Sequence, residues 1–297
     1  MAAGTPPTVS LAVKKSDALA NVDNGIVTMY SSHLTKFCKS DEEQQDVAQP
    51  AARSFLIPHH NLLIGSLPIR DTQRIVEAAK PIHLTTVDAV YEGGDEIDYL
   101  YFPIDCVISS VGILEDGSSV EISMTGREGL VGLSALIGGG RALHWTRTSV
   151  EGAALRIPTV VLKQQLEHSD ALNDAIMRAY RRLFTQICQR SVCNVRHSLM
   201  QRLSLWLLMM QDRVGSKDLP FTQEDIANRI SVRRAGISVA ASMLQSTNVI
   251  SYHRGKIVIN DRSLLENSAC ECYKVLGQDF QEDPGGGAHH PFEIFAP

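Results

Sequence analysis

Hydrophobic and polar residues alternate in short runs through the first half of the chain. The runs are separated by turn residues and lie at 82–90, 99–102, 107–114, 119–124 and 149–157. The step Asp116-Gly117 between two of these runs favours a β-hairpin, because glycine accepts the positive φ angle that tight turns require. Many short strands without intervening helices predict a small antiparallel β-barrel.

The pattern changes to a helical period after Asp170. Apolar residues then recur at steps of three or four, namely Leu172, Ile176, Ala179, Leu183 and Ile187. This spacing predicts a long amphipathic helix whose pattern extends toward Met200. The stripe is longer than one small barrel needs, so we expect it to form a coiled-coil-like dimer seam rather than to pack only on its own domain.

Two short helices are predicted after a loop at 215–218. Thr222 is a suitable N-cap for the first helix, because Asp225 follows three residues later near the positive end of the helix dipole. The second helix begins near Arg233. The residues expected to face inward are Ile226, Ala227, Ile230, Ile237, Ala240, Ala241 and Leu244. Two such helices with a short break are typical of a helix-turn-helix.

A β-hairpin is predicted directly after these helices, at 249–259, with Arg254-Gly255-Lys256 at its tip. Helix-turn-helix and hairpin together make a winged helix. In such a unit the second helix enters the major groove of DNA while the hairpin, the wing, contacts phosphates. The expected DNA contacts are Thr222, Gln223, Arg233, Arg234, Ser238, Arg254 and Lys256.

The distribution of charge supports this interpretation. The chain has 297 residues and a net charge of −5, yet residues 196–262 hold ten Lys or Arg and five Asp or Glu. That segment is therefore +5 and the remainder of the chain is −10. From Arg229 to Lys256 there are five basic residues and no acidic one. A basic segment in an acidic protein predicts double-stranded DNA as the partner.

These segments resemble the Crp/Fnr family of bacterial transcription regulators. The resemblance rests on residues 222–227, 232–234 with Ile237, 244–250 and, upstream, 91–102. It covers residues 62–273 and implies an α+β fold with a cyclic-nucleotide-binding-like jelly roll, a long dimerisation helix and a C-terminal winged helix. It also implies a homodimer on a palindromic operator, and RNA polymerase is a further candidate partner.

The resemblance and the composition together give an expected domain order. Its parts are a largely disordered N-terminal extension at 1–52, an effector domain at 53–169, a dimerisation helix region at 170–212, the winged helix at 213–280 and a flexible tail at 281–297.

The effector domain departs from the nucleotide-binding members of the family. The candidate pocket residues, taken from its nearest match to their phosphate-binding segment, are Gly129, Gly132, Leu133, Arg141 and Arg147. Gly132 stands where those members have an acid, and Ala142 stands where they have an arginine. Loss of the arginine removes a charge-assisted clamp on the cyclic phosphate, so we expect no binding of cyclic AMP. The alternative is a sensor that binds a cyclic nucleotide through other residues.

The sequence indicates neither catalysis nor metal binding. The chain has no G-x-S-x-G, H-E-x-x-H or Walker pattern, so we do not expect an enzyme. Cys270 and Cys272 form a C-x-C without a second cysteine pair, and Cys188 and Cys193 are too far apart in helical register to share a face. We therefore expect no metal and no cofactor. A protein-interaction adaptor without DNA binding is the alternative from a different class.

The expected location is a reducing, cytoplasmic compartment. The six cysteines are scattered and do not form a disulfide framework, and the N-terminus lacks the pattern of a secretory signal. No apolar stretch is long enough for a membrane span, so we expect no membrane partner.

Overall fold

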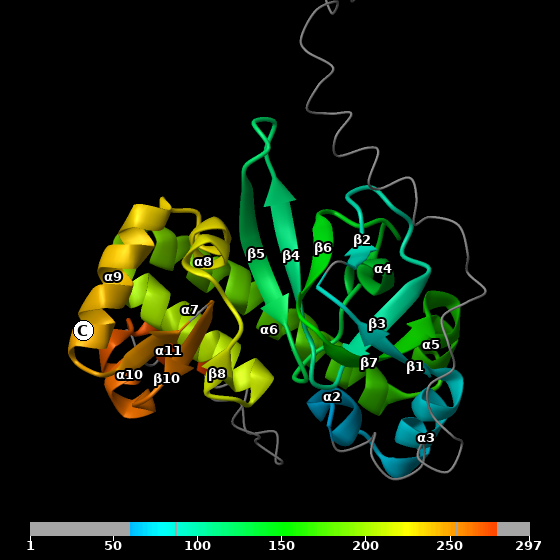
Figure 1. The fold of residues 1–297 in the computed structure, drawn as a ribbon. Coiled ribbons are helices and arrows are strands. Elements are labelled where there is room, and N and C mark those ends of the chain that lie inside the picture. Colours follow the sequence, from blue (N-terminus) through cyan, green and yellow to red (C-terminus); the bar gives the residue numbers. More distant parts are fainter. Residues whose placement is uncertain (1–59, 87, 254, 278–297) are drawn as a thin grey trace, which may run out of the picture. The chain divides into compact units, whose positions relative to one another are not determined.

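The computed structural model describes residues 60–277, apart from residues 87 and 254 (Figure 1). The expected N-terminal extension, the C-terminal tail and Arg254 lie outside the described residues. The described chain begins with two helices that the strand pattern did not predict, α2 (Leu62–Gly65) and α3 (Ile69–Ala78). Asn61 caps α2, because its side chain accepts a hydrogen bond from the Ile64 amide and donates one to the Pro103 carbonyl.

Residues 60–169, the sheet domain, contain two antiparallel sheets. The first has the strand order β1-β7-β3 and the second β2-β6-β4-β5. The strands are β1 (Lys80–Leu84), β2 (Ala89–Tyr91), β3 (Tyr99–Pro103), β4 (Val107–Ile113), β5 (Ser119–Thr125), β6 (Trp145–Val150) and β7 (Gly152–Pro158). This arrangement is consistent with the expected jelly roll, although the described strands do not pair into a closed barrel.

The predicted run at 149–157 is two strands, because β6 pairs in one sheet and β7 in the other. The hairpin between β4 and β5 is confirmed, and Gly117 in its turn has a φ of 80°. Two short helices, α4 (Ser134–Ile137) and α5 (Thr159–Leu166), complete the domain. Leu100, Phe102 and Ile157 point into its core and are fully buried.

The long helix is α6 (Asp170–Arg196), and Ser169 caps it by accepting a hydrogen bond from the Leu172 amide. Its predicted apolar stripe packs inside the chain. Leu172, Ile176 and Ala179 are buried in the core of the sheet domain, and Leu183 packs against that core. The part of the stripe at Leu172, Ile176 and Ala179 therefore packs within the chain and does not form a dimer seam, whereas Leu183 and Ile187 are half-buried and a seam there stays a prediction.

A second apolar stripe runs along the exposed side of α6, and we call it the outer stripe. It consists of Met177, Tyr180, Phe184, Val192 and Val195, each more than a third exposed. The rings of Tyr180 and Phe184 stack with their centroids 6.5 Å apart. Steps of three, four, eight and three residues connect them in order, and each step keeps them on one helix face.

The expected dimerisation region contains two helices rather than one. His197 has an extended backbone that ends α6, and α7 (Leu199–Val214) starts after Ser198, which forms a capping box with Gln201. Gly215 ends α7 with a φ of 71°, which explains the predicted loop at this point.

The winged helix is confirmed. After β8 (Asp218–Leu219) come α8 (Gln223–Arg229), α9 (Arg234–Ser246), β9 (Ile250–His253) and β10 (Lys256–Ile259), followed by α10 (Arg262–Ser268) and α11 (Cys272–Gly277). The three strands form one sheet in the order β8-β10-β9. His253 pairs with Lys256, so the wing has a two-residue turn, in which Gly255 has a φ of 83°.

One hydrophobic core joins α7 and the winged helix to the second sheet. Val107, Met124 and Val150 of the sheet belong to the same buried cluster as Trp206 and Phe221, whose rings meet edge to face at 5.0 Å. Figure 1 shows α8 next to β5. Among the described helices, none combines the length and the apolar character that crossing a membrane requires.

Candidate nucleic-acid interface

The start of α8 is held by a reciprocal cap. Thr222 Oγ1 accepts a hydrogen bond from the Asp225 amide at 3.1 Å, and the Thr222 amide donates to the Asp225 carboxylate at 2.8 Å. The predicted N-cap is thus confirmed. Thr222 itself is exposed. It lies beside the wing, because a Cβ atom added at Gly255 would lie 3.6 Å from the Thr222 methyl group.

The two helices of the motif cross where the sequence predicts. Ala227, Ile230 and Ile237 are all buried, and Ala227 is small enough to let α8 and α9 approach closely. Ser231 turns the chain between the helices with a φ of 54°, and the Val232 amide donates to the Ala227 carbonyl. This packing buries one face of α9 and leaves its opposite face exposed to solvent.

Two of the expected DNA contacts are hydrogen-bonded to each other. Ser238 Oγ donates to Gln223 Oε1 at 2.5 Å, which joins the recognition helix α9 to the first turn of α8. The Gln223 amide also donates to the hydroxyl of Tyr252 in the wing at 3.3 Å. Both side chains are half-buried, so they orient the three parts of the motif relative to one another.

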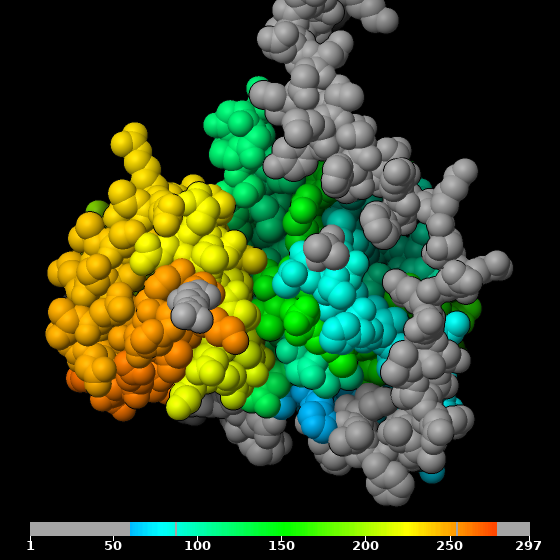
Figure 2. Space-filling view, viewed as in Figure 1, coloured from blue at the N-terminus to red at the C-terminus, as the bar shows by residue number. Residues whose placement is uncertain are grey.

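The basic residues at the start of α9 face solvent. Arg233 is the N-cap of α9 and is exposed, and the side chain of Arg234 is 69% exposed with Glu224 at 3.9 Å. Lys256 is exposed at the start of β10, whereas Arg254 lies outside the described residues. Figure 2 shows the winged-helix segment, coloured yellow to orange, open to solvent on the face in view. The surface combines a helix N-terminus with basic side chains, which suits a phosphate backbone.

Arg229 does not belong to this surface, although it lies in the basic segment. Its guanidinium donates to Glu121 Oε2 at 2.9 Å and to Ser149 Oγ at 2.7 Å, and it lies over the ring of Phe221. Arg229 therefore joins α8 to the sheet domain. Its pairing with Glu121 had no signal in the sequence, because 108 residues separate them.

Glu121 collects one donor from its own domain, Ser109 Oγ at 2.8 Å, and three from outside the sheet domain. Besides Arg229, the guanidinium of Arg190 in α6 and the indole N–H of Trp206 in α7 donate to Oε1 at 2.8 and 2.9 Å. Burial opposes the ionised form of this fully buried carboxyl group, but the two guanidinium groups outweigh burial and hold its pKa below the ordinary glutamate value. A second buried ion pair joins α7 to the sheet domain, with Arg213 Nε 2.9 Å from Glu128 Oε1.

The five candidate pocket residues do not line one cavity. Arg141 is exposed on an open groove of about 390 Å³, where its guanidinium donates to Glu96 and to the Gly94 carbonyl. Gly129 and Leu133 line a separate space of only about 20 Å³ beside α6. The guanidinium of Arg147 lies over the ring of Trp145, 5.2 Å from its centroid.

Gly132 has no room for a side chain, and Ala142 is buried. Gly132 has a φ of 96°, and a Cβ there would lie 2.6 Å from Leu100 Cδ2 and 2.7 Å from the Tyr91 hydroxyl. Ala142 is buried, with 6% of its surface exposed. The positions where the family resemblance expects an acid and an arginine are thus enclosed by the sheet domain itself.

Comparison with known proteins gives a consistent result. Residues 201–268 match the family model of the Crp-like helix-turn-helix domain. Comparison with curated protein sequences gave no match.

Solved structures share the fold at low sequence identity. One is a chain from Eubacterium rectale assigned to the Crp/Fnr family of transcriptional regulators, with a TM-score of 0.55 and 18% identity over 69% of this chain and 96% of that one. Another is the c-di-GMP-responsive global regulator CLP from Xanthomonas campestris, with a TM-score of 0.55 and 16% identity over 65% of this chain and 100% of that one. A third is TTHB099, a CRP-family transcriptional regulator from Thermus thermophilus, with a TM-score of 0.53 and 19% identity over 63% and 96%.

The fold and the family match define the class. The chain has a cyclic-nucleotide-binding-like sheet domain, a long connecting helix and a Crp-like helix-turn-helix domain, in that order. Residues 201–268 are similar to the Crp-like helix-turn-helix domain, and the described chain shares its fold with solved transcription regulators of the Crp/Fnr family.

Proposed function

We propose that the chain regulates transcription as a homodimer, that it binds a palindromic operator through α9 and the wing, and that its sheet domain does not bind cyclic AMP. The observation that carries the proposal is that Arg233 and Arg234 at the start of α9 and Lys256 at the start of β10 are all exposed, with Glu224 of α8 3.9 Å from Arg234. Arg234 stands at the helix N-terminus, where a side chain of a winged helix meets base edges. Lys256 stands on the wing, where it neutralises phosphate.

The outer stripe of α6 supports the dimer. Phe184 is 57% exposed and Val195 is 82% exposed, which is costly for large apolar side chains facing water. A second copy of α6 would cover both in a parallel helix pair. Dimerisation also places two recognition helices on one duplex, which a palindromic operator requires.

The enclosed positions in the sheet domain support the loss of cyclic AMP binding. A cyclic phosphate needs a guanidinium directed at it, and the guanidinium groups nearest to the expected position belong to Arg141 and Arg147. Arg141 is paired with Glu96, and Arg147 lies over Trp145. Arg141 lies on the open groove of about 390 Å³, but its guanidinium is already bonded there to Glu96 and to the Gly94 carbonyl.

The test is selection of bound fragments from sheared genomic DNA of the source organism by the full-length protein. We expect wild-type protein to enrich fragments that share an inverted repeat, and Arg234→Ala to enrich them less and to relax the preference at one base pair of each half-site. Retention of all fragments equally by both proteins, or of none by wild type, would refute sequence-specific DNA binding.

A further inference from the structure

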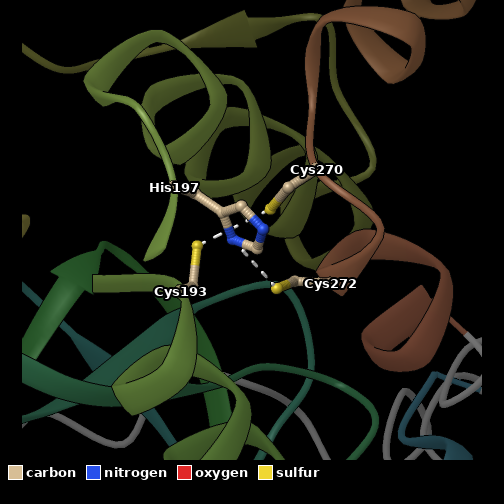
Figure 3. Close-up of side chains that lie close together, drawn as sticks. All are labelled: Cys193, His197, Cys270 and Cys272. Atoms are coloured by element: carbon tan, nitrogen blue, oxygen red, sulfur yellow. Dashed lines mark hydrogen bonds between the residues drawn. The ribbon is translucent and has the colours of Figure 1, made fainter. Parts of the chain in front are cut away.

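Four potential metal ligands converge where α6 ends. Cys193 lies in the last turn of α6 and His197 follows that helix, whereas Cys270 and Cys272 flank the start of α11. One ligand atom from each residue lies within 4.8 Å of all the others. Figure 3 shows the three sulfur atoms and the imidazole ring directed toward one another. Three thiols and an imidazole are brought together here from two segments more than 70 residues apart.

We propose that Cys193, His197, Cys270 and Cys272 bind one Zn²⁺ ion in a closed, tetrahedral Cys3His site. Thiolate sulfur and imidazole nitrogen are the ligands of structural zinc sites, and four protein ligands leave no open position for a substrate. On binding, the three thiols release their protons to solvent and the imidazole binds in its neutral form. No oxidant or reductant takes part.

The dimensions of the cluster fit a single ion. Zn–S bonds of about 2.3 Å at tetrahedral angles place neighbouring ligand atoms about 3.7 Å apart. Cys193 Sγ and Cys270 Sγ are 3.6 Å apart, and Cys272 Sγ lies 3.5 Å from His197 Nδ1. The first distance is much longer than the S–S bond of a disulfide, which is about 2.05 Å. A polynuclear iron–sulfur cluster is wider than one ion and needs ligands set farther apart.

The groups around the ligands also fit a metal site. Glu271 accepts from His197 Nε2 at 3.2 Å, so the carboxylate orients the ring and leaves Nδ1 directed at the three sulfur atoms. The side-chain amide of Gln189 donates to Cys272 Sγ at 3.1 Å, which stabilises a thiolate. Three thiolates and one Zn²⁺ leave a net charge of −1, and the partly buried guanidinium of Arg202 interacts electrostatically with Cys193.

The proposed site differs from the sequence prediction of no metal. That reasoning compared Cys193 with Cys188, which is exposed and lies on another face of the helix. The relevant partner is His197, four residues after Cys193 and therefore on the same side of the helix end. A Cys-x-x-x-His pair together with a distant Cys-x-Cys pair is the signal that the sequence contains.

The ion would fasten the winged-helix domain to the end of α6. Cys193 and His197 lie immediately before the bend at Ser198, and Cys270 and Cys272 lie after the wing. Bound Zn²⁺ therefore links the two sides of the bend through the C-terminal helices. Because zinc binds only the folded arrangement, its removal should lower the melting temperature of the full-length protein.

The first experiment measures metal in wild-type protein purified under reducing conditions. Mass spectrometry should find about one zinc per chain. After chelation, titration with Co²⁺ should produce the intense visible d–d bands and the thiolate charge-transfer band of tetrahedral cobalt, saturating at about one ion per chain. Protein that has no bound zinc and gives no such spectrum would overturn the proposal, as would a Cys193–Cys270 disulfide found by mass spectrometry in place of the metal.

The second experiment assigns the ligands. Cys272→Ser and His197→Ala should each weaken Co²⁺ binding at least tenfold and change the intensity of the charge-transfer band, because each removes one of the four ligands. Cys188→Ser, on the same helix but outside the cluster, should bind one Co²⁺ with the wild-type spectrum. Wild-type spectra in all three variants would place the metal elsewhere and refute the assignment. DNA binding is not used as a readout, so failure here leaves the proposed regulation of transcription untouched.

Discussion

The winged helix and the sheet domain place their charged side chains in opposite ways. On the winged helix, Arg233, Arg234 and Lys256 are exposed and surround a recognition helix. In the sheet domain, Glu121 and Glu128 are buried, and both pair with arginines that come from outside the domain. The first arrangement leaves charge available to an external phosphate. The second uses charge internally, to hold the sheet domain against α6, α7 and α8.

Arg229 shows why this comparison matters for function. It belongs to the same basic segment as Arg233 and Arg234, yet its guanidinium is bonded to Glu121 and Ser149. Counting basic residues along the sequence therefore overestimates the surface available to DNA. The number of phosphates that each winged helix neutralises is set by the exposed groups alone.

The largest effect is expected from removing the buried carboxylate. Glu121→Ala leaves the guanidinium of Arg190 and that of Arg229 without their partner, and Arg190 is buried. Breaking a buried ion pair on one side costs about 3–5 kcal/mol, so the free energy of unfolding should fall by that order. Urea denaturation of both proteins measures the loss. Glu115→Ala, in the exposed turn between β4 and β5, is the control and should change stability by less than about 0.5 kcal/mol.

The same carboxylate predicts a pH dependence. Because the folded state lowers the pKa of Glu121, its ionised form stabilises the fold above the ordinary glutamate pKa of 4.5, and this contribution is lost as the pH falls through the lowered value. The stability gap between wild type and Glu121→Gln should therefore narrow in acid. A gap that stays constant from pH 7 into the acid range would show that Glu121 is not held ionised by its neighbours.

The second-largest effect tests which apolar stripe of α6 faces the second copy of the chain in the proposed dimer. Phe184→Glu puts a charge in the outer stripe, so we expect light scattering to report monomers. Loss of the second recognition helix should weaken binding to the operator by about 100-fold, since linked binding sites gain affinity of that order. Arg178→Glu, exposed next to Met177 in the sequence but about 100° around the helix from it, should remain dimeric. A dimeric Phe184→Glu with wild-type affinity would place the seam elsewhere.

The third effect separates base reading from phosphate contact within the winged helix. Arg234→Ala should cost about 1–3 kcal/mol on the operator and relax the preference at one base pair, because a bidentate arginine–guanine contact discriminates by that amount. Lys256→Ala should weaken operator and scrambled duplexes alike and reduce the slope of log affinity against log salt by about one. Fluorescence anisotropy at several salt concentrations measures both. If Arg234→Ala weakened both duplexes equally and Lys256→Ala weakened only the operator, the wing would read bases and α9 would contact phosphates.

The features on which these predictions depend differ in whether the sequence alone could predict them. The cap formed by Thr222 and Asp225 was predictable because its two residues are three apart and the motif is local. The contact between Arg229 and Glu121 was not, because it depends on how a strand and a helix 108 residues apart pack together. The stripe on α6 was predicted as a stripe, but its residues Leu172, Ile176 and Ala179 pack inside the chain, because a helix with two apolar faces gives no local sign of which face the chain covers itself.

The smallest effect is the one expected from cyclic AMP, which should give no heat in titration calorimetry with the full-length protein. A cyclic phosphate would need an arginine near Ala142, which is buried, and room near Gly132, where an added Cβ would lie 2.6 Å from Leu100. Ala142→Arg should therefore lower stability without creating a binding site, because the new guanidinium has no cavity to enter. The control is Arg141→Ala, whose side chain lies on the open groove and should leave the titration flat. Saturable heat at micromolar cyclic AMP in wild type, abolished by Arg141→Ala, would identify Arg141 as a substitute clamp and show that the sheet domain, like the winged helix, presents its charge to an external phosphate.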